Sequence, residues 1–185
     1  MVDWSFFKVS PNQFPKIKGS GPLLIVGGGR CVWDDFDKLG RRWDGDILTI
    51  NDITQHFPLK VKHCYSNDSK MVPRWISARR PRYRILFEET IIPHSCNEGD
   101  VNKWPFRGGG SSAFIACLVG LGMGYDQITL IGCPLDNSGH YFDPPWVETK
   151  LLREVPEGNE WQASKHIFRG KVKSLSGRTK QILGD

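Results

Sequence analysis

Two glycine-rich segments are the stretches of this chain best suited to bring the backbone close to a ligand. The first consists of Gly27, Gly28, Gly29 and Arg30, and the second ends in Gly110, Ser111 and Ser112. Glycine has no Cβ, and the free N–H groups of a helix start attract anions. The sequence therefore predicts a phosphate or nucleotide site at these segments. The alternative is a pair of tight turns in which glycine serves packing alone.

Neither segment matches a well-known phosphate-binding motif. The dinucleotide pattern G-x-G-x-x-G, placed on Gly27 and Gly29, meets Val32 at its last position. A P-loop requires Gly-Lys-Ser/Thr, and this chain has Arg30 and Cys31 there instead. The residues thus give no support to the usual NAD and ATP assignments.

Polar side chains follow two of the predicted strands. Asn51 and Asp52 follow the run 46–50, and Asp136, His140 and Tyr141 follow the run 127–133. Ligands in open α/β sheets bind at the carboxyl ends of strands. A histidine serves as general base near neutral pH, and a tyrosine hydroxyl stabilises a leaving phosphate. We therefore expect the last two residues to be catalytic and the others to bind a nucleotide.

The catalytic loop is expected to be mobile and to close over both glycine segments. The proline-rich residues 144–158 follow it and are able to form a lid. His166 is a second candidate base on a predicted helix. The other histidines are interpreted as structural or surface residues: His56, His63 and His94.

The elements that must position these residues alternate between short apolar strands and helices. Strands are predicted centrally at 23–26, 47–50 and 127–131, and further strands within 61–68, 83–87 and 171–175. Helices are predicted around 75–76 and at 33–39, 113–122, 160–168 and 179–183, with residues 88–107 forming an irregular excursion. This order predicts an α/β fold: a single Rossmann-like domain at 22–185, with a mainly parallel sheet, helices on both faces and an N-terminal arm at 1–21.

The composition is that of an ordinary globular protein with an excess of basic residues. Hydrophobic residues make up 39% of the chain, and its net charge is +5. The five cysteines form no C-x-x-C pair, and no apolar run is long enough to span a bilayer. We therefore expect a cytoplasmic protein with reduced thiols.

The basic residues gather in two segments. One contains Arg74, Arg79, Arg80, Arg82 and Arg84, and the other extends from Lys165 to Lys180. Such clusters favour acidic partners such as nucleotides or nucleic acid. The alternative is a solvated basic face.

The order of these motifs resembles a known group of proteins. The pieces are Ile25 to Arg30, Thr49 to Asn51, Gly110 to Phe114, Leu121 to Gly132 and Tyr141. They are similar to the bacterial lipooligosaccharide sialyltransferases and to the related domain of archaeal pterin-precursor pyrophosphokinases, a group that includes short proteins of tailed phages. The likeness covers residues 22–143.

The resemblance implies a nucleotide-sugar-dependent glycosyltransferase with a CMP-linked donor. It implies that the first glycine run approaches the phosphate or sugar, that Asn51, Ser111 and Ser112 contact the nucleotide, and that Tyr141 donates to the leaving phosphate. The chain departs from the family at Arg30 and Cys31, where Pro-Ser is usual. The family's catalytic histidine, in a later lid, has no match in this chain.

Two other functions stay open at this point. A non-enzymatic nucleotide- or nucleic-acid-binding phage accessory protein fits the short chain, and its location would be the host cytoplasm. A nucleotide-dependent pyrophosphokinase would require Mg²⁺, for which Asp136 and Asp143 are the candidate ligands. Neither Asp136 nor Asp143 belongs to a D-x-D pair, so the leading hypothesis includes no metal.

Overall fold

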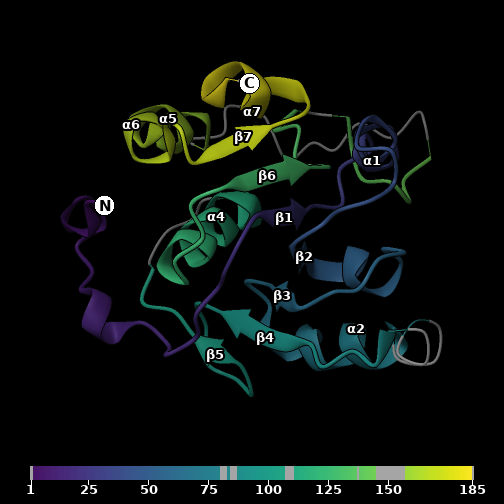
Figure 1. The fold of residues 1–185 in the computed structure, drawn as a ribbon, viewed down its shortest axis with the longest axis horizontal. Coiled ribbons are helices and arrows are strands. Elements are labelled where there is room, and N and C mark those ends of the chain that lie inside the picture. Colours follow the sequence, from purple (N-terminus) through teal and green to yellow (C-terminus); the bar gives the residue numbers. More distant parts are fainter. Residues whose placement is uncertain are drawn as a thin grey trace.

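The protein is built around one parallel sheet. The computed structural model describes residues 2–79, 83, 87–106, 111–136, 138–144 and 157–184. Within this part of the chain, a 7-stranded sheet has the order β5-β4-β3-β2-β1-β6-β7, and every neighbouring pair is parallel (Figure 1). The expected α/β fold with a parallel sheet is therefore confirmed. β1, β2 and β6 lie at its centre, as the sequence predicts.

The elements have the following bounds. The strands are β1 Leu23–Val26, β2 Asp46–Ile50, β3 His63–Tyr65, β4 Ile92–Ser95, β5 Asn102–Lys103, β6 Ile128–Ile131 and β7 Val172–Ser174. The α-helices are α1 Val32–Lys38, α2 Val72–Arg79, α4 Ser112–Gly122, α5 Glu157–Ala163, α6 Lys165–Phe168 and α7 Gly177–Leu183. Short 3-10 helices are η1 Trp4–Phe7, η2 Pro11–Gln13, η3 Asn51–Gln55 and η4 Ser69–Met71.

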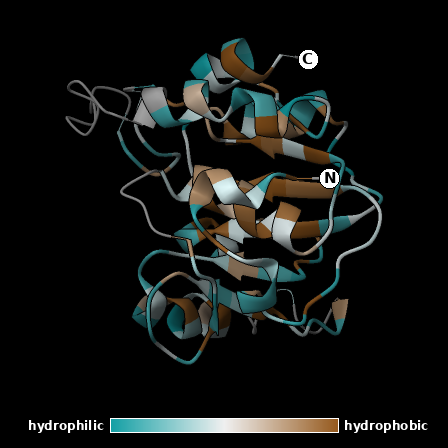
Figure 2. Ribbon diagram, turned by 90° about the vertical axis from the view of Figure 1, so that its left-hand side faces the viewer, coloured by the Kyte–Doolittle hydropathy of each residue, from teal (hydrophilic) through white to brown (hydrophobic). Residues whose placement is uncertain are grey.

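Both faces of the sheet are covered, and every residue of the central strands β1 and β6 is buried. In β1, Leu23 and Ile25 pack against α4 and the C-terminal helices, whereas Leu24 and Val26 pack against α1 and the segment around η3. This division follows from the two-residue period of a strand. Figure 2 shows hydrophobic residues concentrated in the strands and in the helix that lies against them.

The sequence prediction fails between α2 and α4. The strand expected at 83–87 is wrong, because its described residues Tyr83 and Phe87 have helical conformation. The excursion expected at 88–107 contains β4 and β5, which extend the sheet beyond β3. Alternation of apolar residues is absent in these strands, since β4 is Ile-Pro-His-Ser and β5 has only two residues.

The N-terminal segment packs aromatic rings against the α4 side of the core. Trp4, Phe7 and Phe14 contact this core, and the rings of Trp4 and Phe14 meet edge to face with centroids 4.9 Å apart. Phe6 is 47% exposed and touches the ring of His166. Among the described residues, no helix has the length and apolar character to cross a membrane.

Arg79 does not belong to a solvated basic face, although the sequence groups it with one. It is fully buried at the end of α2, where Nε and Nη2 donate to the two carboxylate oxygens of Glu89 at 2.8 and 2.7 Å. The same guanidinium also donates to the carbonyls of Thr54, Phe57 and Leu59. It therefore fixes the segment that follows η3 and continues from the end of β2.

Two buried histidines form part of a directional hydrogen-bond chain. Trp104 Nε1 can only donate, so His94 Nδ1 accepts at 3.1 Å. Neutral His94 then donates from Nε2 to His63 Nδ1 at 3.0 Å, and His63 Nε2 donates to Tyr125 Oη at 3.2 Å. Tyr125 in turn donates to Asp46, which Lys62 also contacts. The prediction that these histidines are structural agrees with this network.

We expect Arg79→Met to lower the free energy of unfolding by about 3–5 kcal/mol, because it leaves Glu89 buried without its partner. Arg74→Met is the matched control, since Arg74 is an exposed residue of the same helix. It should change stability by no more than about 0.5 kcal/mol. Urea unfolding of both variants is the measurement. Equal losses would show that the buried pair has no special role.

Stability should also fall as the pH decreases below about 6.5. Burial lowers the pKa of His63 to about 4, and the charge of Lys62 lowers it further. Burial lowers the pKa of His94 to about 3, and the neighbouring His63 adds to this shift. The unfolded chain therefore binds more protons below about pH 6.5, and each histidine costs up to about 1.4 kcal/mol per pH unit until its folded pKa is reached.

The measurement is the free energy of unfolding at several pH values between neutrality and this acidic range. His94→Asn should reduce the slope, whereas His166→Asn, which changes an exposed histidine, should leave it in place. A slope that both variants preserve would contradict the assignment to the buried pair.

Candidate functional site

The first glycine run forms a turn that lies against a second turn at the end of β6. Gly27 N donates to Ile131 O at 2.9 Å, and Gly29 N donates to Gly132 O at 2.8 Å. A Cβ on Gly27 would lie 2.5 Å from Cys133 Sγ, and one on Gly29 would lie 2.7 Å from Gly132 O. The outer two glycines are therefore required by backbone packing, as the alternative interpretation of the sequence proposed.

Gly28 differs from its two neighbours. A Cβ at this position would have its nearest contact at 3.6 Å, with the ring of Tyr141, and would lie 3.8 Å from Asp52 Oδ1. Its φ is not in the left-handed region, so the backbone itself does not demand glycine. Of the three glycines, only this one could carry a Cβ without overlap.

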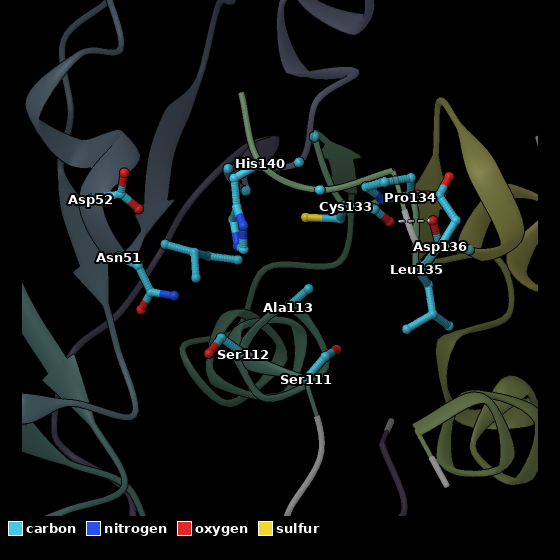
Figure 3. A pocket seen from close by; sticks show the side chains of 17 residues that line it. Asn51, Asp52, Ser111, Ser112, Ala113, Cys133, Pro134, Leu135, Asp136 and His140 are labelled. Atoms are coloured by element: carbon cyan, nitrogen blue, oxygen red, sulfur yellow. Dashed lines mark hydrogen bonds between the residues drawn. The ribbon is translucent and has the colours of Figure 1, made fainter. Parts of the chain in front are cut away.

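A cavity of about 310 Å³ lies where the ends of β1, β2 and β6 meet the start of α4. Figure 3 shows side chains from the ends of β2 and β6 and from the start of α4 around it, with the ring of His140 between them. Most of the predicted site residues line it: Gly27, Gly28, Gly29, Asn51, Asp52, Ser111, Ser112, Asp136 and His140. The first glycine segment and Ser111 of the second segment thus line the same cavity. Gly110 lies outside the described residues.

Arg30 and Tyr141 are not among the residues that line the cavity. The guanidinium of Arg30 donates to Pro144 O at 2.8 Å, on the far side of the loop. The ring of Tyr141 packs against Trp33 and its hydroxyl donates to Asp52 Oδ2 at 2.9 Å. Burial, and then this hydrogen bond, raise the pKa of Tyr141, so the hydroxyl stays a donor.

Asn51 and Asp52 leave β2 in an unusual backbone conformation. Asn51 has a φ of 59°, in the left-handed region that non-glycine residues seldom occupy and asparagine tolerates best. The turn is held because Thr54 Oγ1 donates to Asn51 O at 2.7 Å. This conformation places both polar residues at the edge of the cavity instead of continuing the strand.

α4 presents its first turn to the same cavity. Ser111 is the N-cap, and its hydroxyl accepts from Phe114 N at 3.3 Å. Ser112 Oγ accepts from Asn67 Nδ2 at 3.5 Å. The first N–H groups of the helix have no partner within the helix, and the helix dipole favours an anion there.

His140 is oriented by Asp143. Its Nδ1 lies 3.3 Å from Asp143 Oδ2, and its backbone N donates to the same oxygen at 2.7 Å. These contacts, led by the backbone hydrogen bond, lower the pKa of Asp143. The ring of His140 also stacks on the ring of Phe142. With Nδ1 directed at the carboxylate, Nε2 is the nitrogen that remains for a ligand.

The loop that carries His140 is joined to the glycine turn. Arg30 N donates to Gly139 O at 3.0 Å, Tyr141 N donates to Gly28 O at 3.0 Å, and Gly29 pairs with His140 as an antiparallel bridge. The loop therefore already lies over the first glycine segment. The second part of the expected lid, residues 145–156, falls outside the described residues.

Asp35 ties three segments together behind the cavity. It is fully buried on α1, and its Oδ2 accepts from Gly132 N at 3.1 Å and from Ser176 Oγ at 2.6 Å. Lys38 contacts the other oxygen at 2.9 Å. Asp35 therefore joins α1 to the β6 turn and to the segment before α7.

Several lining residues were not predicted. They are Ile50, Ala113, Gly132, Cys133, Pro134, Leu135, Gly139 and Thr179. The turn after β6 carried a signal, because Gly-Cys-Pro directly follows an apolar strand. No sequence pattern indicates Thr179 as a site residue. It comes from α7, and its Oγ1 donates to Cys133 O at 2.6 Å.

The carboxylates among the lining side chains give the cavity an acidic character. The described lining residues include two carboxylates, Asp52 and Asp136, and no lysine or arginine. Among the described residues, no group of three or more histidine, cysteine, aspartate or glutamate side chains is placed to hold a metal ion. A bound anion would therefore rely on backbone N–H groups and hydroxyls.

No protein-family model and no curated protein matches the sequence. Solved structures do match. The sialyltransferase CST-II, solved with a trisaccharide acceptor and CMP, aligns with a TM-score of 0.59 and 15% identity over 89% of this chain and 85% of that one. Cst-I, a monofunctional alpha-2,3-sialyltransferase from Campylobacter jejuni, aligns with a TM-score of 0.56 and 11% identity over 90% and 81%.

The chain shares its fold with bacterial sialyltransferases. CstII from Campylobacter jejuni in complex with CMP gives a TM-score of 0.55 at 12% identity, over 89% of this chain and 84% of that one. The resemblance read from the motifs is therefore confirmed at the level of the fold.

The different roles of the glycines lead to a testable contrast. Gly27→Ala should lower the free energy of unfolding by about 1–3 kcal/mol, because its Cβ would overlap Cys133 and Gly132. Gly28→Ala should change it by less than about 1 kcal/mol, since its Cβ meets nothing closer than ordinary contact. Denaturant unfolding of the two variants measures this contrast. Equal destabilisation would contradict the packing geometry.

Proposed function

We propose that the protein is a nucleotide-sugar-dependent glycosyltransferase that binds a CMP-linked sugar in this cavity. The observation that carries the proposal is the convergence of the glycine turn, the end of β2 and the start of α4 on one cavity. The shared fold supports it, since two of the similar structures contain CMP. The cavity is at the lower end of the usual range for ligand pockets, which suits a nucleotide.

In this proposal, the phosphate of the donor lies between Gly28 and the first turn of α4. The N–H groups of Ser112 and Ala113 donate to it, helped by the hydroxyl of Ser112. The charge that develops on the leaving phosphate is then stabilised by fixed dipoles and hydrogen bonds. Asp136 lies on the opposite side of the cavity, where it accepts hydrogen bonds from the hydroxyls of the sugar.

His140 is the proposed general base. Asp143 orients its Nδ1, so Nε2 accepts the proton of the acceptor hydroxyl. The acceptor oxygen forms a bond to the anomeric carbon while the bond from that carbon to the phosphate oxygen breaks. The nucleoside monophosphate leaves with the bonding electrons. Tyr141 donates to Asp52 in the present arrangement, so a direct role on the phosphate would require that hydrogen bond to break.

A thermal-shift experiment with CMP tests binding first. A ligand at about 100 times its dissociation constant stabilises the folded state by about 2.7 kcal/mol, which corresponds to a shift of about 5–10 °C for a protein of this size. Gly28→Val should abolish the shift, because its side chain would occupy the space beside the turn. Gly21→Val is the control: a Cβ there meets nothing, although its positive φ lowers basal stability in the absence of ligand.

Turnover is tested by hydrolysis and transfer of a CMP-linked sialic acid. His140→Ala should reduce the rate by about 10²-fold or more while CMP binding is retained. Unchanged rates would remove His140 from the mechanism. Failure of every CMP, UMP, GMP and AMP ligand to shift the melting temperature would reject the proposal as a whole.

A further inference from the structure

Asp52 is a carboxylate held in a defined orientation at the edge of the cavity. Its Oδ2 accepts the hydroxyl hydrogen of Tyr141 at 2.9 Å. Tyr141 is itself fixed, because its backbone N donates to Gly28 O and its ring meets Trp33 and His56 edge to face. Within the described part of the chain, no ion pair to a lysine or arginine involves Asp52.

The chemistry of this carboxylate limits what it can meet in a ligand. An ionised carboxylate only accepts hydrogen bonds, so its remaining lone pairs require a donor. A phosphate oxygen would be repelled, and a hydroxyl or an amino group would be bound. Because hydrogen bonds to charged groups are stronger than those between neutral groups, the matching donor contributes strongly to recognition.

The position of Asp52 decides among the donors of a nucleotide. It stands at the carboxyl end of β2, beside β1, and its Oδ1 lies near the position that a Gly28 Cβ would take. In dinucleotide-binding sheets, whose complete glycine motif this chain lacks, the phosphate lies at the glycine turn after the first strand and the ribose at the end of the adjacent strand. An acidic residue at that strand end meets the 2′-hydroxyl.

We propose that Asp52, oriented by Tyr141, accepts the 2′-hydroxyl of ribose, so that the cavity selects ribonucleotides over 2′-deoxyribonucleotides. This inference rests on the proposed nucleotide-binding function. It assigns Tyr141 to a positioning role, since its hydroxyl acts through the carboxylate. Gly28 allows the ribose to approach because its missing side chain leaves the space beside Oδ1 open.

The experiment compares the dissociation constants of CMP and dCMP by calorimetry, for the wild-type protein and for three variants. The wild type should bind dCMP about tenfold more weakly or worse, as expected for the loss of a charged hydrogen bond. Asp52→Ala should bring the ratio close to one. Tyr141→Phe should reduce the ratio while CMP still binds, because the carboxylate loses its orientation.

Asp126→Asn is the matched control, because Asp126 is an exposed carboxylate between α4 and β6, outside the cavity. It removes the same charge and should leave the ratio of CMP to dCMP binding unchanged. If this variant reduced the ratio as much as Asp52→Ala, the effect would be one of net charge and the inference would be overturned.

The other outcomes separate this inference from the proposed function. Equal binding of CMP and dCMP by the wild type overturns the inference and leaves the function standing. A change in the ratio of CMP to UMP in Asp52→Ala, with the ribose preference unchanged, shows that Asp52 recognises the base amine and also overturns it. If CMP does not bind, the same comparison is made with the pairs UMP and dUMP, GMP and dGMP, and AMP and dAMP. If none of these nucleotides binds, both the inference and the proposed function are rejected.

Discussion

The close approach of two backbone turns, at the carboxyl ends of β1 and β6, is the constraint on which the candidate site depends. Gly27 and Gly29 lie so near Gly132 and Cys133 that no side chain fits between them. Hydrogen bonds across the contact hold it, and Asp35 adds a buried carboxylate that accepts from Gly132 N. Of the three glycines, only Gly28 could carry a Cβ without overlap, and all three line the cavity.

From this contact, the rest of the site follows by sheet topology. β2 is the other neighbour of β1, so its end delivers Asn51 and Asp52 to the same edge. The loop after β6 returns and pairs with the glycine turn, which brings His140 over the cavity. Arg79 holds the chain that follows β2 in place, since its guanidinium donates to three carbonyls of η3 and the segment after it. Residues that hold these segments together therefore also line the candidate site or lie next to it.

Apolar periodicity and glycine placement were sufficient to predict the parallel sheet and the convergence of distant segments. They failed where burial is achieved by polar groups. β4 contains Pro93 and His94. Its burial depends on a hydrogen bond between His94 and His63, which no local sequence pattern predicts. Arg79 looks like part of a basic run in the sequence, and only the position of Glu89, ten residues later, makes it a core residue.

The sequence was also unable to assign separate roles to three adjacent glycines. The reason is physical: the roles depend on what lies opposite each Cα, and those neighbours come from distant parts of the chain, most of them more than 100 positions away. Gly27 and Gly29 face the β6 turn, whereas Gly28 faces Tyr141 and Asp52. The same limit applies to Tyr141, whose chemistry suggested a direct contact with phosphate and whose hydroxyl is in fact bound to a carboxylate.

The two kinds of polar group around the cavity are complementary to one ligand class. The start of α4 offers donors and the positive end of a helix dipole, which suit an anion. Asp52 and Asp136 offer acceptors and negative charge, which suit hydroxyl or amino groups and would repel a second phosphate. In the proposed ligand, a nucleoside monophosphate joined to a sugar, the phosphate lies between two parts rich in hydroxyls. That alternation of charge and donors matches the order in which the groups are arranged, from the end of β2 across the glycine turn to the turn after β6.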